Sequence, residues 1–254
     1  MIYITGDTHS YFDRFREDIF FEQTRMTKED YVIICGDFGG VWYQEGNKGE
    51  EMELDWLNSL PFTTLFIDGN HENFTRLNKY PIKEWNGGKV HEIRPSVLHL
   101  MRGEVFEIDG HKIFAFGGAA SHDINDGILD PNDFVDEDDF RREYQKWWSD
   151  GKIFRVKGVS WWHEEMPSML EMINGLDNLE KHNWKVDFVI THSPSASTIG
   201  ILGGGLYNQD SLTKYLEEIR VKLDYKKWFM GHMHINKQLN TKDILLYEQI
   251  IRIA

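Results

Sequence analysis

Carboxylate, amide and imidazole side chains follow the ends of five short apolar segments. The first segment, Ile2–Thr5, leads through Gly6 to Asp7 and His9. A single Asp or His at such a place is commonly a hydrogen-bonded structural residue, and the glycine before it commonly reflects turn chemistry. Five such endings along one chain instead indicate one shared site. The later endings supply Asp37, Asn70, His71, His192, His232 and His234.

The residue types at these endings favour a metal centre. Oxygen and imidazole nitrogen donors without a thiolate suit Mn²⁺, Fe or Zn²⁺ better than Ca²⁺, which prefers oxygen alone. There are more donors than one tetrahedral ion needs, so we predict two ions that share a carboxylate. The predicted donors are Asp7, His9, Asp37, Asn70, His192, His232 and His234.

The apolar segments read as buried strands of an α/β protein. Their near-continuous hydrophobicity is typical of strands covered on both faces, and the carboxyl ends of such strands line the ligand crevice of an open sheet. Segments around 97–106 and at 243–254 suggest mixed strand pairing. The predicted strands are Ile2–Thr5, Tyr31–Cys35, Thr64–Ile67, Lys112–Phe116, Phe188–Thr191 and Trp228–Met230.

Apolar residues at helical spacing predict helices within residues 12–19, 52–60, 167–179 and 210–223. Pro61 ends the second helix, Pro167 opens the third, and Asp210 caps the fourth. The alternation of strands and helices indicates an α/β architecture. The apolar faces predicted for the first three helices comprise Phe12, Phe15 and Ile19; Met52, Trp56 and Leu60; and Leu170, Ile173, Leu176 and Leu179.

Composition limits the class of protein. The 254 residues, 41% of them hydrophobic, show no linker or repeat, so we expect one domain over 1–254. A net charge of −14 argues against broad nucleic-acid binding and is compatible with divalent cations.

Cys35 lies in an apolar run and reads as a buried thiol. No secretory signal or membrane-length apolar stretch is found, so we expect a soluble, cytoplasmic protein, and nothing in the sequence indicates an oligomeric state.

In order, the segments GDTH, GDFG, GNHE, TH and GHMH resemble the motif series of the calcineurin-like metallophosphoesterase superfamily, particularly its small bacterial or phage-type members. The resemblance runs from Asp7 to His234 and implies a four-layer α/β/β/α sandwich with mixed sheets. It also implies a dinuclear site at the carboxyl ends of strands, holding Mn or Fe, with Zn or Ni as alternatives. By position, Asp7, His9 and His234 would hold one ion, Asn70, His192 and His232 the other, and Asp37 would bridge them.

The resemblance implies hydrolysis of a phosphoester by a metal-bridging hydroxide, with Asp37 and His71 as catalytic residues. His71 would lie near the leaving group and donate a proton or a hydrogen bond. Many relatives carry a second Asp three residues after the bridging Asp, which orients this His, but here that position is Gly40. Val41 replaces the arginine of Ser/Thr protein phosphatases and weighs against that branch.

The acidic, Trp-containing segment 121–166 interrupts the core pattern. A solvated loop is the plainer interpretation; the alternative is a lid whose Trp147, Trp148, Trp161 or Trp162 stacks on a nucleobase. His122 reads as a loop residue or a substrate contact. The substrate class that we predict is a small phosphoester, mono- or diester, with nucleotides included. A nuclease and a non-catalytic scaffold are the alternatives, and a loop at 201–209 is expected to border the cleft.

Overall fold

The computed structural model describes residues 1–203 and 209–254. Its larger sheet has seven strands in the order β15-β1-β2-β3-β6-β5-β4. Strands β1, β2, β3 and β6 are parallel, and β15, β5 and β4 pair antiparallel at the two edges. The bounds are β15 (Ile251–Arg252), β1 (Ile2–Thr5), β2 (Tyr31–Ile34), β3 (Thr63–Phe66), β6 (Val97–Leu100), β5 (Gly88–Arg94) and β4 (Ile82–Trp85).

The second sheet has six strands in the order β13-β14-β12-β11-β8-β7. Its centre is parallel, and its two edge pairs, β13 with β14 and β7 with β8, are antiparallel. The mixed pairing expected from the sequence is therefore confirmed in both sheets. The bounds are β13 (Lys237–Gln238), β14 (Asp243–Leu245), β12 (Lys227–Met230), β11 (Phe188–Thr191), β8 (His111–Phe116) and β7 (Glu104–Ile108).

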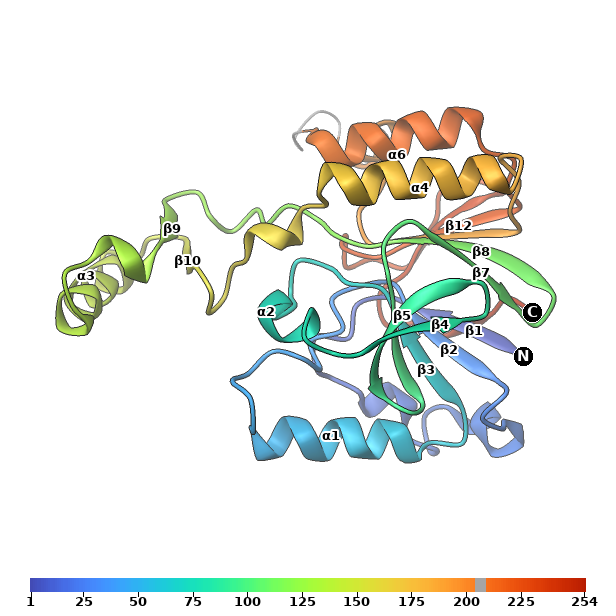
Figure 1. The fold of residues 1–254 in the computed structure, drawn as a ribbon, viewed down its shortest axis with the longest axis horizontal. Helices are drawn as coiled ribbons and strands as arrows, with labels where there is room; N and C mark the ends of the chain where they lie inside the picture. Colours follow the sequence, from blue (N-terminus) through green and yellow to red (C-terminus); the bar gives the residue numbers. More distant parts are fainter. Residues whose placement is uncertain (204–208) are drawn as a thin grey trace.

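The two sheets pack face to face and helices cover their outer faces, which confirms the four-layer α/β/β/α sandwich (Figure 1). Ile33 of β2 and Ile190 of β11 belong to the apolar layer between the sheets. Their neighbours along each strand, Val32 and Val189, face the outer helical layers. The helices are α1 (Lys48–Ser59) and α2 (Phe74–Leu77) beside the larger sheet, and α4 (Met169–Lys181), α5 (Ala196–Gly203) and α6 (Ser211–Lys222) beside the smaller.

Helix α1 confirms the predicted helix at 52–60, but the predicted apolar face was only partly right: Leu60 is buried and Trp56 packs against the core, whereas Met52 does not. Met52 is 72% exposed, whereas Leu54 and Leu57 are buried. The face is rotated because α1 also buries Glu50, whose carboxylate accepts the backbone N–H groups of residues 42 and 43 and pairs with Arg76. A buried charge that is fully hydrogen-bonded thus sets the orientation of the helix.

The helix predicted within residues 12–19 is wrong. Two 3₁₀ turns, Asp13–Phe15 and Phe21–Arg25, take its place. Arg16 follows the first turn with an extended backbone, which ends the helical path. Consequently Ile19 is 60% exposed, and Phe20 packs edge-on against Tyr3 instead.

Helices α4 and α6 match their predicted positions. Asp210 caps α6 through a 2.7 Å bond from the Thr213 backbone N–H. In α4 the apolar face was only partly right, because Leu179 is buried but Leu170 and Ile173 are exposed. The expected cleft-bordering loop at 201–209 lies largely outside the described residues.

Residues 121–166 project from the sandwich as an arm (Figure 1). The arm contains a two-stranded parallel sheet, β9 (Gly127–Leu129) and β10 (Phe154–Val156), and helix α3 (Glu137–Ser149) at its far end. We call Ser121–Asp123 together with Arg155–Glu165 the neck of the arm. Within the described ranges, no helix has the length and apolarity needed to cross a membrane. The assignment of 1–254 to one domain stays a prediction.

Candidate metal centre

The predicted donor residues lie at the carboxyl ends of β1, β2, β3, β11 and β12, where both sheets present the same edge. Four of these donors have a left-handed backbone: His9 (φ 46°), Asp37 (45°), His232 (65°) and His234 (48°). Such conformations cost non-glycine residues on the order of 1–3 kcal/mol each and concentrate at functional sites. The chain therefore holds these side chains in place at the expense of backbone strain.

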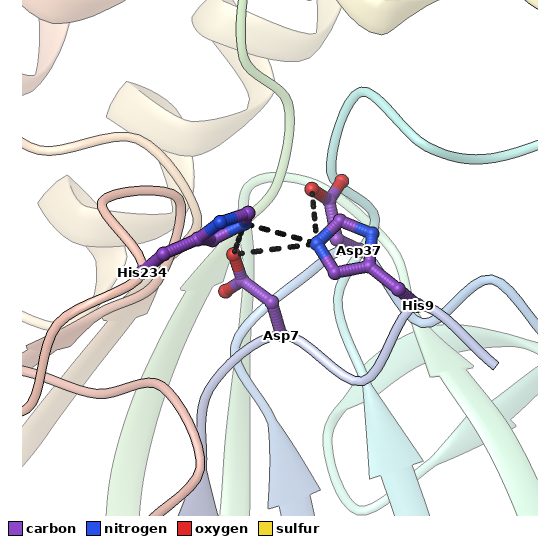
Figure 2. Close-up of side chains that lie close together, drawn as sticks. All are labelled: Asp7, His9, Asp37 and His234. Atoms are coloured by element: carbon purple, nitrogen blue, oxygen red, sulfur yellow. Dashed lines mark hydrogen bonds and ion pairs between the residues drawn. The ribbon is translucent and has the colours of Figure 1, made fainter. Parts of the chain in front are cut away.

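The first group of donors combines Asp7, His9, Asp37 and His234 (Figure 2). The Nε2 atoms of His9 and His234 lie 3.0 Å apart. Nε2 of His234 is 3.1 Å from Oδ2 of Asp7, and Nε2 of His9 is 3.6 Å from Oδ2 of Asp37. All four side chains point one donor atom toward a common centre, as a bound cation requires.

The second group combines Asp37, His192 and His232, and it shares Asp37 with the first. Nε2 of His192 is 3.3 Å from Oδ1 of Asp37, so the two carboxylate oxygens face different groups. Asn70 is the neighbouring buried amide on the segment after β3. The structure thus brings together six of the seven predicted donors in two groups, with Asn70 beside them.

Two buried atoms at this centre lack a hydrogen-bond partner among the described residues: Oδ1 of Asn70 and Nε2 of His192. The other ring nitrogen of His192 donates to the carbonyl of Cys35 at 2.8 Å, so Nε2 is the nitrogen that a cation would bind in place of a proton. Unpaired buried acceptors are costly unless a ligand satisfies them. The N/O donor set and these two atoms fit divalent cations.

The carboxylates dominate the electrostatics of the site. Burial opposes a charge on His192, yet Asp37 and Asp7 raise its pKa to about 10. Burial raises the pKa of the Asp37 carboxyl, but His192 and the neighbouring histidines outweigh it and hold that pKa well below its usual range. Burial and the charge of His192 lower the pKa of His232 to about 3. Negative charge buried at this depth needs a positive partner.

Two glycines that precede predicted donors, Gly69 and Gly231, leave room for the carboxylates of Asp37 and Asp7. A Cβ on Gly69 would overlap the carboxylate of Asp37, and a Cβ on Gly231 would overlap that of Asp7. The backbone N–H of His232 donates to Asp7 at 3.0 Å, and that of His71 donates to Asp37 at 2.8 Å. Glycine is therefore needed at these positions because the backbone packs directly against a carboxylate, and not only because the chain turns there.

His71 lies at the edge of the centre, with its ring 4.8 Å from that of His9 and stacked on Trp42 at 5.8 Å. Burial lowers its pKa to about 4, and the nearby Arg155 adds to the effect while Asp37 opposes it. Arg155 lies on β10 of the arm, 3.0 Å from the ring. Sequence reasoning missed Arg155 because the motif series does not extend into the arm.

Other residues singled out in the sequence have varied placements. His122 is near the centre, with its ring 5.6 Å from that of His232, although a plain loop position was favoured. Trp148 is 72% exposed on α3 at the far end of the arm, together with Trp147. Neither tryptophan reaches the donors.

Two cavities adjoin the donors. One, of about 580 Å³, is lined by His232, His234, His122 and Ser193 among others. The other, of about 700 Å³, begins at His9 and has an aromatic wall. Each cavity can accept a group larger than a phosphate. The aromatic and apolar side chains of the second cavity are Tyr11, Phe12, Tyr43, Met52 and Trp56.

Comparison with known proteins agrees with this geometry. A sequence model of the family described as calcineurin-like phosphoesterase matches residues 1–236. The chain belongs to this family of metal-dependent phosphoesterases, which confirms the class of enzyme predicted from the motifs.

Similar curated proteins include lariat debranching enzymes. Lariat debranching enzyme A of Xenopus laevis is 28% identical over 141 residues, covering 50% of this chain and 25% of the relative. The Schizosaccharomyces pombe enzyme is 21% identical over 231 residues, covering 82% of this chain and 43% of the relative. The chain therefore spans less than half the length of these relatives.

Proposed function

We propose that the chain hydrolyses phosphoesters with two divalent cations held by Asp7, His9, Asp37, Asn70, His192, His232 and His234. The observation that carries the proposal is that two donor groups share Asp37 and that Oδ1 of Asn70 and Nε2 of His192 are buried without partners among the described residues. A non-catalytic scaffold would be expected to lose donors, and all seven positions are kept.

Two divalent cations, when bound, would activate a water molecule near neutral pH and neutralise phosphoryl charge. Manganese or iron suits the histidine- and oxygen-rich donor set, and zinc or nickel would be tolerated. Asp37, with one oxygen facing each group, holds the two positions at a fixed separation. His71 contributes a hydrogen bond from its ring N–H on the leaving-group side.

The substrate we propose is a small phosphodiester that carries a nucleoside. The two cavities adjoin different donors, so a phosphate at the centre has room for a substituent in each. A monoester would fill one cavity only. Tyr11 and Tyr43 are largely exposed in the cavity beside His9, where an aromatic wall can stack on a base. His122 and Ser193 would contact the other substituent.

A second candidate is a nucleic-acid diester, which the relatives named for debranching lariats favour. The net charge of −14 weighs against a long polyanion, because it offers little backbone neutralisation. A short or branched segment that reaches the centre through both cavities would satisfy both observations. The cytoplasmic location stays a prediction.

The test is a substrate panel with added Mn²⁺: bis(p-nitrophenyl) phosphate, p-nitrophenyl phosphate, cyclic nucleotides and single-stranded DNA. We expect turnover of the aryl diester and of at least one cyclic nucleotide to exceed turnover of the monoester. His192→Ala should abolish this activity, whereas His182→Ala, at the C-terminal end of α4, should leave it intact. Metal-loaded protein that hydrolyses none of the panel would contradict the proposal.

A further inference from the structure

The hydrogen bond to the ring of His71 comes from the arm and not from the segment after Asp37. Gly40, three residues after Asp37, offers no side chain. Instead Nη2 of Arg155 lies 3.0 Å from Nε2 of His71. A guanidinium can only donate, so Nε2 of His71 accepts this bond and Nδ1 carries the ring hydrogen.

Arg155 is itself fixed in one orientation. Its Nε and Nη2 donate to the two carboxylate oxygens of Asp123 at 2.7 and 2.8 Å. Its Nη1 donates to the carbonyl of Ser160 at 2.8 Å. This side chain is buried, and a two-point pair with a carboxylate confers geometric precision. The guanidinium is therefore a rigid support and not a free surface cation.

A second contact from the arm orients the same ring. Trp42 stacks on His71, and Trp162 of the neck packs edge-on against Trp42 at 5.6 Å. The indole N–H of Trp162 donates to Thr75 at 3.0 Å, which anchors the neck to the sandwich. The ring of His71 is thus positioned by both a hydrogen bond and a stacked wall.

A third contact reaches the donor Asn70. Its Nδ2 donates to Oγ of Ser121 at 3.4 Å, and Ser121 in turn donates its backbone N–H and its hydroxyl to Glu165 at 2.8 and 2.7 Å. These bonds fix the orientation of the Asn70 amide. Its Nδ2 faces Ser121, and its Oδ1 is left for a cation. Partners of this kind orient ligands and tune a metal site.

We propose that Arg155 is a positioning residue for phosphoester hydrolysis and that the neck of the arm orients both Asn70 and His71. The effect of Arg155 on hydrolysis rests on the proposed function. The orientation of Asn70 and His71 by the neck does not. With Nε2 occupied by Arg155, His71 presents Nδ1–H as its one ring donor to a bound phosphoester. In this chain the arm therefore supplies the hydrogen bond to His71 that Gly40, which has no side chain, cannot supply.

The structural part is tested by ¹⁵N-histidine NMR on metal-free and Zn²⁺-loaded protein. The ring signals of His71 are assigned by their absence from the spectrum of His71→Ala. We expect the wild-type ring to show the Nδ1–H form, and Arg155→Gln to shift the ring toward Nε2–H or a mixture. Arg141→Ala, which removes an exposed arginine of the same arm, should change nothing. An unchanged His71 spectrum in folded Arg155→Gln would overturn the proposal, whatever the activity.

The catalytic part is tested with the aryl diester and an alkyl diester under Mn²⁺. We expect Arg155→Ala to lower kcat by about 10–100-fold with KM within about threefold, as for other outer-shell partners. Arg155→Lys and added guanidinium should restore part of kcat. If Arg155→Ala instead raises KM alone, or leaves both constants unchanged, the positioning role is refuted. An inactive wild type would refute the proposed function and leave the NMR result to decide the structural claim.

Discussion

Gly69→Ala perturbs the centre at the point where β3 delivers Asn70. A Cβ on this glycine would overlap Oδ1 of Asp37 and would lie 2.5 Å from its backbone N and 2.8 Å from its Cγ. The backbone of Gly69 is not left-handed, so alanine meets no conformational barrier of its own. The whole effect of the substitution is therefore a collision with the shared carboxylate.

The size of the effect follows from these distances. Ordinary Cβ contacts begin near 3.4 Å, so the backbone N of Asp37 and the loop must separate by about 0.9 Å, and Oδ1 of Asp37 must move further. Displacing a catalytic group by about 1 Å can cost on the order of 100-fold in rate. Overpacking of this kind costs about 1–3 kcal/mol of stability, which is about 2–12 °C in Tm for a chain of this size.

The assay is turnover of bis(p-nitrophenyl) phosphate with Mn²⁺, with metal content and Tm measured on the same preparations. The matched control is Gly200→Ala in α5, where an added Cβ meets nothing within 4 Å. We expect the control to keep full activity. A folded Gly69→Ala protein with wild-type turnover and metal content would refute the position assigned to Asp37.

Further predictions concern the shared carboxylate, the edge histidine, and a buried ion pair away from the site. Asp37→Asn should lower metal content below two ions per chain and reduce turnover by at least about 100-fold, because the loss of charge weakens both positions; elemental analysis and kinetics check this, and a fully loaded, active variant would contradict it. His71→Ala should reduce hydrolysis of alkyl esters more than that of nitrophenyl esters, since only poor leaving groups need the hydrogen bond; equal losses would oppose this role. Arg220→Ala should destabilise the fold by about 2–3 kcal/mol, measured by urea unfolding, because Asp243 stays buried with two other donors but loses its 2.6 Å ion pair; a loss below about 0.5 kcal/mol would count against a buried charge there.

The strands and the donors could be predicted because one signal reports both. A buried parallel strand is a continuous apolar run, and the polar residue at its carboxyl end is the one free to bind a ligand. The run before Asp37 therefore located β2 and a donor together. The same logic found the ends of β3, β11 and β12.

The helix faces were harder to predict because hydrophobicity alone does not set them. In α1 the buried Glu50 fixes the orientation through bonds to Trp42 and Arg76, which lie outside the helix, and it leaves Met52 in solvent. Near the first strand, aromatic packing of Phe20 on Tyr3 replaced the expected helix. Such outcomes depend on tertiary partners that a local pattern does not contain.

Arg155 could not be predicted for a different reason. It lies 84 residues from His71 in the chain, in a segment that carries acids and tryptophans but no motif. The one sequence signal was the absence of an acid at position 40, which left His71 either with another partner or with none. Only the path of the arm back to the sheet edge identifies that partner.

The most direct test of the account is the anomalous difference map of a crystal soaked in Mn²⁺. We predict two peaks separated by roughly 3.5–4 Å, with the carboxylate of Asp37 between them. Asp7, His9 and His234 should surround one peak, and Asn70, His192 and His232 the other. A single peak, or peaks away from Asp37, would contradict the dinuclear centre and the hydrolase function inferred from it.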